Sequence, residues 1–337
     1  MDALLRLVSP FSRLVCRVRS ARAAKEGGRR HVSPIPVVSV GNLTVGGSEK
    51  TPLVIEILRL SLELGRRPAL VTRGYRGAWE SRGGVLSDGR ELRAGWREAG
   101  DEPVLVARRV PRAGIFVGKH RYMSCLRANE AGFDLAVLDD GFQHFKLARD
   151  LEIVLLDPAS RSPLREGESA LGRADILLWK RGGSGEKLRR IRDRFPRLSV
   201  FEYGVEPGGL RRLDTGDTID PDILRREPVL AVSGIARPER FAAALRALGA
   251  VPAASLEFPD HFPYPERALR KIAAAAEAAR AGAVVTTEKD AVKLAGRLCS
   301  PLASKVLVLR VGLVLPGDFL ARLGDTLAGL PRGGGRR

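Results

Sequence analysis

One short segment constrains the fold more than any other part of this chain. Residues 37–52 have the sequence VVSVGNLTVGGSEKTP, in which a β-branched run leads through a glycine-rich turn into Lys50 and Thr51. The residues that follow are rich in Leu and Ile, as expected for a helix. Glycines allow backbone N–H groups to converge on phosphate oxygens, and the start of a helix adds the positive end of its dipole. The segment therefore predicts a buried strand, a phosphate-binding loop and a helix.

Each residue of such a loop has an expected task. We expect Gly46, Gly47 and Ser48 to bind nucleotide phosphates together with Lys50 and Thr51. Lys50 would reach the β- and γ-phosphates, and the Thr51 hydroxyl would ligate Mg²⁺. The alternative is a strand-to-helix turn that binds no ligand.

The loop departs from the common pattern at Glu49. That pattern places one glycine immediately before the lysine and another at the start of the loop, where this chain has Glu49 and Thr44. A side chain at position 49 resists the backbone angles that glycine adopts there. A carboxylate beside bound phosphates is also electrostatically unfavourable, so we expect Glu49→Gly to tighten ATP binding.

Short β-branched runs alternate with amphipathic stretches along the rest of the chain. This alternation predicts an α/β fold, namely a P-loop NTPase-like, mostly parallel sheet flanked by helices, with a second, smaller α/β domain and an N-terminal amphipathic helix. The expected strands are 36–40, 69–72, 114–117, 135–138, 153–156, 176–179, 229–233, 283–287 and 306–311. The expected helices begin near Thr51, His120, Gly185, Pro238, Pro265 and Gly317.

The composition along the chain also predicts domain boundaries. Polar residues with Pro207, Gly208, Gly209 and Pro221 mark an inter-domain connection. The expected parts are a membrane-interface helix at 1–30, a nucleotide-binding domain at 31–205, a linker at 206–227, a smaller C-terminal α/β domain at 228–330 and a disordered tail at 331–337.

The first residues form an apolar stripe at helical spacing with basic residues between. This pattern is typical of a helix that lies in a membrane interface, although a core-packing helix would show the same stripe. The apolar positions are Leu4, Leu7, Val8, Phe11, Leu14, Val15 and Val18, and the basic ones include Arg6, Arg13, Arg17 and Arg19.

The overall charge and the cysteine content limit the class of protein. Lys and Arg number 57 against 39 Asp and Glu, a net charge of +18, which attracts polyanions such as nucleic acid, an acidic membrane or a phosphorylated substrate. An arginine-rich composition from a GC-rich genome is the alternative explanation. The 3 cysteines have no close spacing, which argues against a disulfide framework or a structural zinc site. We find neither a signal-peptide pattern nor an apolar run of roughly 18 residues that would span a bilayer.

A second acidic motif complements the phosphate loop. Residues 134–144 read DLAVLDDGFQH, an apolar strand that ends in Asp139 and Asp140. P-loop enzymes hold Mg²⁺ with a carboxylate in this position, although paired carboxylates also cap loops.

Together these motifs resemble the tetraacyldisaccharide 4'-kinase (lipid A 4'-kinase) family. The resemblance covers nearly the whole chain in order, and it is most specific where LDDGFQH and TTEKD occur together. The matching segments are GGSEKTP at 46–52, TRGYRG at 72–77, GDEP at 100–103, LDDGFQH at 138–144, RD at 149–150, PLREG at 163–167, GIARP at 234–238, FPDH at 258–261 and TTEKDAVK at 286–293.

The resemblance implies a kinase that transfers the γ-phosphoryl group of ATP, with Mg²⁺, to the 4'-hydroxyl of a tetraacylated glucosamine disaccharide 1-phosphate. The implied partners are this anionic glycolipid and an anionic membrane surface, with no nucleic acid and no obligatory protein partner. The implied location is peripheral, on the cytoplasmic face of a bacterial inner membrane.

The resemblance also implies roles for single residues. Asp101 working with His261 would supply the base near the acceptor hydroxyl, and which of the two takes the proton is open. Lys50 and Arg73 would be catalytic cations, although a solvated surface charge is the alternative for Arg73. Asp139 or Asp140 would complete the metal site with Thr51. Candidate substrate-binding residues are Tyr75, Glu102, Gln143, His144 and Arg165.

Two other function classes are weighed against the kinase. A P-loop GTPase or metal-insertion chaperone needs a guanine-reading motif, and the nearest string, at 287–290, has the wrong spacing. A nucleic-acid-binding protein fits the charge, but aromatic residues make up only 5%, too few for base-stacking platforms.

Overall fold

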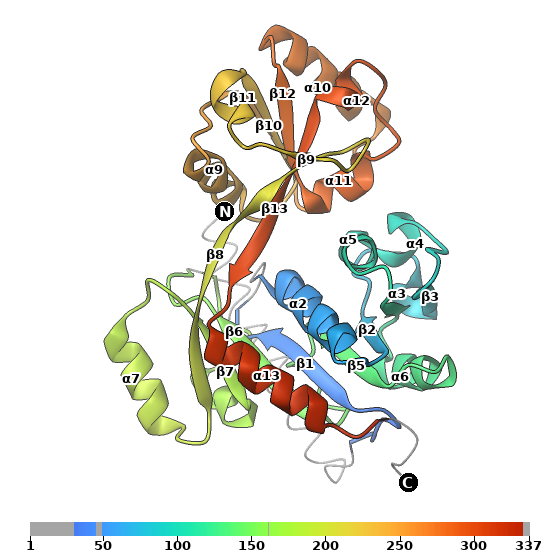
Figure 1. Cartoon of the computed structure of the whole chain (residues 1–337), viewed down its shortest axis with the longest axis vertical. Coiled ribbons are helices and arrows are strands. Elements are labelled where there is room, and N and C mark those ends of the chain that lie inside the picture. The colour runs from blue at the N-terminus through green and yellow to red at the C-terminus, as the bar shows by residue number, and fades with distance from the viewer. Residues whose placement is uncertain (1–29, 45–48, 161, 333–337) are drawn as a thin grey trace. The chain divides into compact units, whose positions relative to one another are not determined.

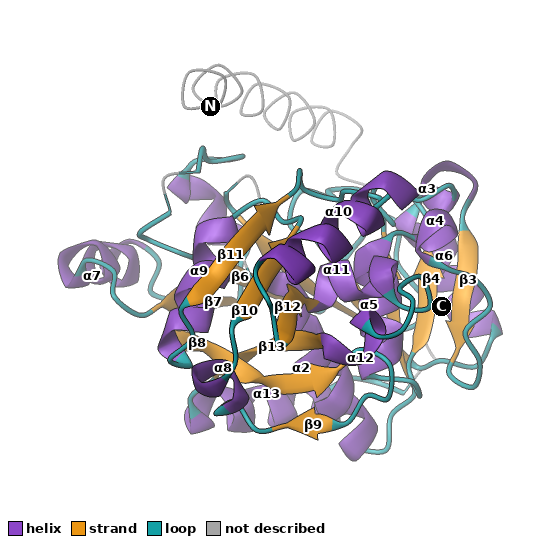
Figure 2. Cartoon of the chain, turned by 90° about the horizontal axis from the view of Figure 1, so that it is seen from above, coloured by secondary structure: helices purple, strands orange, loops and turns teal. Residues whose placement is uncertain are grey.

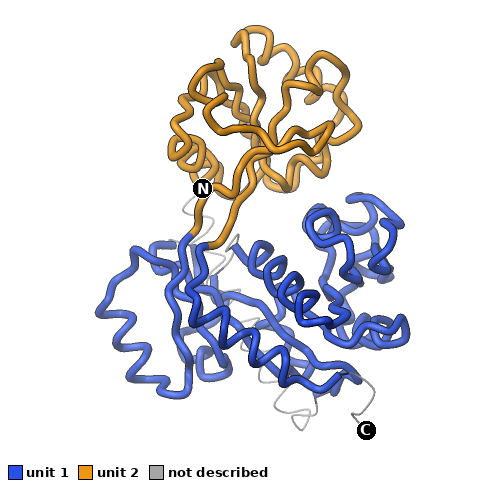
Figure 3. The backbone as a smooth tube through the Cα atoms, in the orientation of Figure 1, with its two compact units in different colours: residues 1–204, 314–337 blue, residues 205–313 orange. Residues whose placement is uncertain are grey.

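The computed structural model describes residues 30–44, 49–160 and 162–332. The expected N-terminal helix, the expected phosphate ligands Gly46, Gly47 and Ser48, and most of the expected tail therefore lie outside the described residues. The chain forms two compact units, Met1–Gly204 with Val314–Arg337, and Val205–Leu313 (Figure 3).

The first unit is built on a sheet in the order β8-β7-β6-β1-β5-β2-β4-β3. Every neighbouring pair is parallel except β3 and β4, which are antiparallel at the edge. The strands are β1 (Val37–Asn42), β2 (Pro68–Thr72), β3 (Gly84–Asp88), β4 (Gly114–Val117), β5 (Leu135–Asp139), β6 (Leu151–Leu156), β7 (Ile176–Lys180) and β8 (Ser199–Arg212). All residues of β1 are buried, as expected for a central parallel strand with both faces covered.

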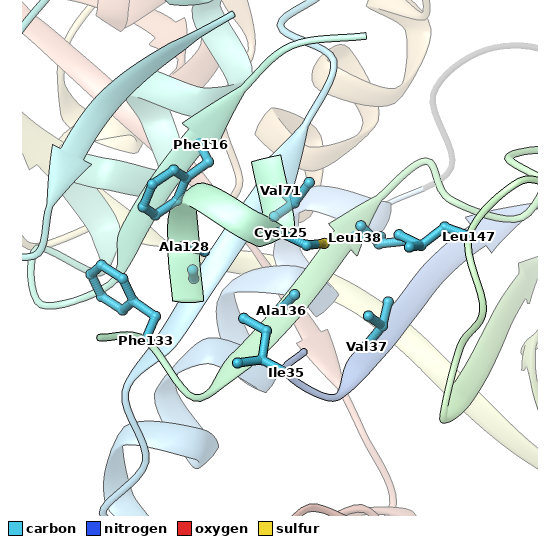
Figure 4. Packing of buried hydrophobic residues seen from close by; sticks show 11 residues of the cluster. Ile35, Val37, Val71, Phe116, Cys125, Ala128, Phe133, Ala136, Leu138 and Leu147 are labelled. Atoms are coloured by element: carbon cyan, nitrogen blue, oxygen red, sulfur yellow. The ribbon is translucent and has the colours of Figure 1, made fainter. Parts of the chain in front are cut away.

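Helices cover this sheet (Figure 1). They are α2 (Lys50–Glu63), α3 (Trp79–Arg82), α4 (Trp96–Ala99), α5 (Asp101–Arg109), α6 (Arg121–Glu130), α7 (Gly185–Arg194) and α13 (Gly317–Gly329), with a 3₁₀ turn, η1 (Glu168–Arg173). α2 contacts β1, β2 and β5, and α13 contacts α2 although the two helices are far apart in the sequence. Cys125 and Ala128 of α6 pack against Val71, Ala136 and Leu138 of the central strands (Figure 4).

The second unit contains a parallel sheet in the order β11-β10-β12-β13. Its elements are β9 (Thr218–Ile219), α8 (Ile223–Arg226), β10 (Val229–Ser233), α9 (Pro238–Ala247), β11 (Pro252–Glu257), α10 (Glu266–Ala278), β12 (Ala283–Thr287), α11 (Glu288–Leu294), α12 (Leu302–Lys305) and β13 (Val306–Val314). The short strand β9 pairs antiparallel with β8.

Alternation along β10 explains why helices cover both faces of this sheet. Successive strand residues point to opposite faces. Val229 and Ala231 belong to one apolar cluster with Leu245 of α9, whereas Leu230 and Val232 belong to another with Ile272 of α10. The two helices consequently lie on opposite sides of the strand (Figure 2).

The expected mostly parallel α/β fold is confirmed. The compact units divide the chain differently from the expected ranges in two segments. Residues 206–227, expected as a linker, carry the end of β8, β9 and α8 and belong to the second unit. Residues 314–330, expected in the C-terminal domain, carry α13 and belong to the first unit, because Phe319, Leu323 and Leu327 are fully buried there. Within the described part of the chain, no helix is long and apolar enough to cross a membrane.

Candidate active site

The predicted motifs of the first unit gather at the carboxyl ends of its parallel strands. β1 ends at Asn42, β5 at Asp139 and β7 at Lys180, and Asp157 directly follows β6. Because neighbouring parallel strands end at the same edge, these residues share one side of the sheet. Open α/β sheets bind their ligands outside this edge.

The phosphate-loop lysine begins a helix, as the sequence predicts. Lys50 is the first residue of α2, and Glu49 precedes it with φ 46° and ψ 24°. This is the left-handed conformation that glycine adopts without strain. Thr51 follows, half-buried, in the first turn. The local backbone at 49–51 therefore has the form of a phosphate-loop exit despite the missing glycine.

Asp140 lies between two cations. Its Oδ1 is 3.1 Å from Lys50 Nζ, and both of its oxygens accept hydrogen bonds of 2.9 Å from Arg165 Nη1. Burial alone would raise the pKa of Asp140, but the Lys50 and Arg165 charges outweigh it and hold that pKa well below its usual range. Asp140 is therefore ionised, and it brings Lys50 of the loop to the end of β5.

Asp139 has a different environment from its neighbour. Burial raises the pKa of Asp139 to about 7, the neighbouring Glu102 carboxylate adds to the rise, and Lys50 opposes it. Its buried Oδ1 accepts no hydrogen bond from any described residue. A buried carboxylate beside a second one and without a donor is what a divalent cation would stabilise.

These residues fit a nucleotide-bound Mg²⁺ better than a metal held by protein alone. No group of three or more His, Cys, Asp or Glu side chains among the described residues could hold a metal ion. Mg²⁺ usually takes one or two carboxylates and completes its shell with phosphate oxygens and waters. Asp139 and the Thr51 hydroxyl are suited to that arrangement.

The turn after the two aspartates is fixed by side chains of the same motif. Gln143 donates to the Asn42 carbonyl at 2.9 Å and accepts from Arg165 at 3.2 Å. Arg149 donates to the carbonyls of Gly141 and His144 at 2.6 and 2.5 Å. Gln143 and His144 thus lie in a turn that is tied to β1 and to Arg165.

A second group of predicted residues lies where a glycine-rich loop packs against the start of α5. A Cβ at Gly74 would come within 2.6 Å of the Ala99 carbonyl, and one at Gly77 within 2.6 Å of Gly100 N. These close approaches bring the loop after β2 against Asp101, the first residue of α5. Asp101 is only 4% exposed, and its Oδ1 accepts from Glu102 N at 3.0 Å.

Arg73 and Tyr75 occupy the exposed side of this loop. Arg73 Nε donates to Glu80 Oε1 at 2.6 Å, and its side chain is 55% exposed. Tyr75 is half exposed, with the Arg76 guanidinium over its ring. Both side chains are accessible to a large acceptor.

In the second unit, the motifs gather at the carboxyl ends of β10 and β12. Asp290 accepts from Gly234 N at 2.8 Å and forms a buried pair with Lys293 at 3.4 Å. Lys289 Nζ lies 3.0 Å from His261 Nε2 and 3.2 Å from Asp260.

His261 has φ 62°, and its side chain is 12% exposed. Phe258 and Phe262, which precede and follow His261 in the sequence, stack on each other with their ring centroids 4.8 Å apart. His261 thus has a backbone conformation that residues with side chains rarely adopt, in a loop whose aromatic side chains pack on one another.

The structure brings Lys50, Asp139, Asp140, Gln143 and Arg165 together at one sheet edge, and the Glu102 carboxylate helps to raise the pKa of Asp139. Asp101 and His261 belong to different units, so the predicted dyad stays a prediction.

Two charged residues of this edge were missed at the sequence level. Arg121 is 5% exposed and donates to the Gly118 carbonyl at 2.8 Å. Burial lowers the pKa of Arg121, while Asp139 and Asp140 oppose that change. Lys180 is the last residue of β7. Its position directly after the predicted strand 176–179 was the feature of the sequence that could have identified it.

The geometry agrees with comparisons to known proteins. The family model described as tetraacyldisaccharide-1-P 4'-kinase matches residues 1–328. A tetraacyldisaccharide 4'-kinase of Syntrophus aciditrophicus is 38% identical over 320 residues, which cover 87% of this chain and 84% of that protein. One from Anaeromyxobacter sp. (strain K) is 40% identical over 316 residues, with 88% and 83% covered.

A solved structure gives the same answer for the fold. The crystal structure of the Aquifex aeolicus enzyme LpxK, in complex with ATP, is similar with a TM-score of 0.74 and 29% identity, covering 96% of this chain and 98% of that one. The GTPase, chaperone and nucleic-acid alternatives receive no support from these comparisons. On this evidence the chain belongs to the tetraacyldisaccharide 4'-kinase family.

Proposed function

We propose that this chain transfers the γ-phosphoryl group of ATP to the 4'-hydroxyl of a tetraacylated glucosamine disaccharide 1-phosphate. The observation that carries the proposal is the 3.1 Å contact between Lys50 Nζ and Asp140 Oδ1, which joins the phosphate loop to the acidic strand end. Phosphoryl transfer depends mainly on positioning and on electrostatic stabilisation of the transferring group.

The residues of the sheet edge divide these tasks. Lys50, at the start of α2, would bind the β- and γ-phosphates, where the helix dipole also favours negative charge. Thr51 and Asp139 would hold Mg²⁺, which when bound neutralises charge on the phosphates. Asp140 orients Lys50, and Arg165 keeps Asp140 in place through both carboxylate oxygens. Gly46, Gly47 and Ser48 are proposed phosphate ligands from the sequence pattern alone.

The acceptor hydroxyl requires a base. Asp101 and His261, one in each unit, are our candidates. In support, Asp101 is buried at a helix start, and the His261 ring lies 3.0 Å from Lys289 Nζ. Arg73, Tyr75, Glu102, Gln143 and His144 are proposed to contact the acceptor or the γ-phosphate. We further propose peripheral attachment to the cytoplasmic face of the inner membrane through residues 1–30.

The direct test is incubation of the protein with labelled ATP, Mg²⁺ and the disaccharide lipid. We expect a phosphorylated lipid that forms only when Mg²⁺ is present, and GTP should replace ATP poorly. Absence of any labelled lipid, or equal labelling of an acceptor that lacks the 4'-hydroxyl, would contradict the proposal.

The base assignment has its own test. Asp101→Ala and His261→Ala should each lower kcat by about 100-fold or more, because a positioned base contributes of that order. ATP affinity should change little, since neither residue is proposed to contact the triphosphate. Near-normal turnover in both variants would rule the pair out.

A further inference from the structure

Glu49 occupies the position where the phosphate-loop pattern has glycine, and its backbone has a left-handed conformation that glycine adopts without strain. Its φ of 46° and ψ of 24° are left-handed, which is rare for a residue with a side chain. The backbone of the loop exit is therefore preserved, and the carboxylate is what distinguishes this loop from the common pattern. Its effect depends on where the side chain lies.

The Glu49 carboxylate is enclosed by polar side chains. Its Oε1 accepts a hydrogen bond of 3.0 Å from Lys180 Nζ, and its Oε2 accepts one of 3.5 Å from the Tyr203 hydroxyl. The side chain is only 8% exposed. Lys180 Nζ also lies 3.7 Å from Asp157 Oδ2, so this one ammonium group forms ion pairs with two carboxylates.

This enclosure is built from adjacent strands. Lys180 is the last residue of β7 and pairs in register with Tyr203 of β8, while Asp157 follows β6. The sheet fixes the backbones of these residues. The Lys180 side chain therefore extends from a rigid position at the end of β7. A charge held on such a rigid element costs little reorganisation when a ligand binds.

The oppositely charged side chains of Glu49 and Lys50 lie on opposite sides of β1. In the sheet order, β1 lies between β6 and β5. Glu49 turns toward the β6–β7–β8 side through Lys180, whereas Lys50 turns toward β5 through Asp140. The extra carboxylate is thus directed away from the side where Lys50, Asp139 and Asp140 meet.

We propose that Lys180 is a positioning residue that holds the Glu49 carboxylate away from the nucleotide phosphates and neutralises its charge. The proposal rests on the proposed function, because it assumes that a triphosphate binds at Lys50. It also changes the expectation drawn from the sequence, since Glu49→Gly should now alter ATP affinity little. Without Lys180, the same carboxylate would repel the ligand.

The experiment is a double-mutant cycle on the affinity for ATP with Mg²⁺, measured by titration calorimetry without lipid. The proteins are the wild type, Lys180→Met, Glu49→Gly and the double variant. Lys180→Met should weaken binding about tenfold in the wild-type background and less than about twofold in the Glu49→Gly background, as expected for directly coupled residues. Lys180→Arg should restore most of the affinity.

Two further measurements separate positioning from a loss of structure. Lys187→Met is the control, because Lys187 forms a more exposed ion pair with Glu168 at 2.9 Å on the same unit; it should leave ATP affinity unchanged. In steady-state kinetics, Lys180→Met should raise the KM for ATP and leave the KM for the lipid acceptor unchanged.

The outcomes distinguish this inference from the proposed function. Equal weakening by Lys180→Met in both backgrounds would mean that Lys180 contacts the phosphates itself, which overturns the inference and leaves the kinase assignment intact. Unchanged ATP affinity in Lys180→Met would also overturn it. A wild-type protein that binds no ATP would overturn the proposed function, and with it the inference.

Discussion

At the scale of single residues, unusual backbone conformations occur in the segments that carry the proposed chemistry. Glu49, Asp140 and His261 all have positive φ, at 46°, 53° and 62°. Such conformations cost of order 1–3 kcal/mol each and persist where surrounding contacts fix them. Here those contacts are Lys180 for Glu49, Lys50 and Arg165 for Asp140, and Lys289 for His261.

Gly74 provides a test of the close approach that brings the loop after β2 against Asp101. Gly74→Ala should destabilise the protein by about 1–3 kcal/mol beyond the cost of its positive φ, because the added Cβ would lie 2.6 Å from the Ala99 carbonyl oxygen and 2.3 Å from Val117 Cγ1. Gly65→Ala is the control, with a similar φ of +70° and no atom within 4 Å. If urea unfolding showed equal losses of stability for Gly74→Ala and Gly65→Ala, the loop would accommodate the added Cβ without further cost.

The sequence indicated which residues belong to this candidate site more successfully than it indicated which of them contact one another. Lys50, Asp139 and Asp140 were identified because a phosphate loop and an acidic strand end have recognisable local patterns. The Glu49–Lys180 pair joins residues 131 positions apart, and nothing local to either residue indicates it. Sequence alone therefore suggested that Glu49 would face the phosphates, whereas in the structure its carboxylate contacts Lys180 and Tyr203.

At the scale of elements, a buried ion pair holds the turn after β5. Arg149 Nε lies 3.0 Å from Glu152 Oε2, with both side chains about equally buried, at 6% and 5% exposure. The same guanidinium donates to the carbonyls of Gly141 and His144. Arg149 thus connects β6 to the turn that follows Asp139 and Asp140.

Removal of this cation should be costly. Arg149→Met should lower the free energy of unfolding by about 3–5 kcal/mol, because it leaves a buried carboxylate uncompensated, and it should also lower turnover. Arg59→Met is the matched control, since Arg59 pairs with Glu56 at 2.9 Å on an exposed helix face and should cost at most about 1 kcal/mol. Similar losses in the two variants, measured by urea unfolding, would contradict the role given to Arg149.

Strands with a strong local signal were predicted, and those without one were missed. The central strands are buried along their whole length and mostly apolar, as β1 and β5 show. In contrast, β11 is an edge strand with alternating exposure and small residues, and β3 is a partly exposed edge strand. Edge strands pair on one side only and stay partly exposed, so they lack the continuous apolar run that marks a central strand, and local composition specifies them poorly.

At the scale of the whole molecule, the chain leaves the first unit and returns to it. The second unit comprises Val205–Leu313, and α13 completes the first unit after it. Arg66 is 3% exposed and donates to the carbonyls of Leu327, Leu330 and Pro331 at 2.6, 3.1 and 2.8 Å. The sequence had grouped this helix with the preceding C-terminal elements, because proximity along the chain was the only available guide.

Core truncations in the two units should therefore act on different parts of the protein. Leu323 of α13 and Leu245 of α9 are both 0% exposed, and replacing either with alanine should cost about 2–5 kcal/mol. In hydrogen-exchange mass spectrometry, Leu323→Ala should raise exchange in peptides from α2 and β2, while peptides from β10 and α10 stay protected. Leu245→Ala should do the reverse. If Leu323→Ala instead exposed β10 and α10 and spared α2, then α13 would fold with the second unit, as the sequence first suggested. The expected result would mean that the nucleotide-binding unit completes its core only with residues that follow the entire second unit in the chain.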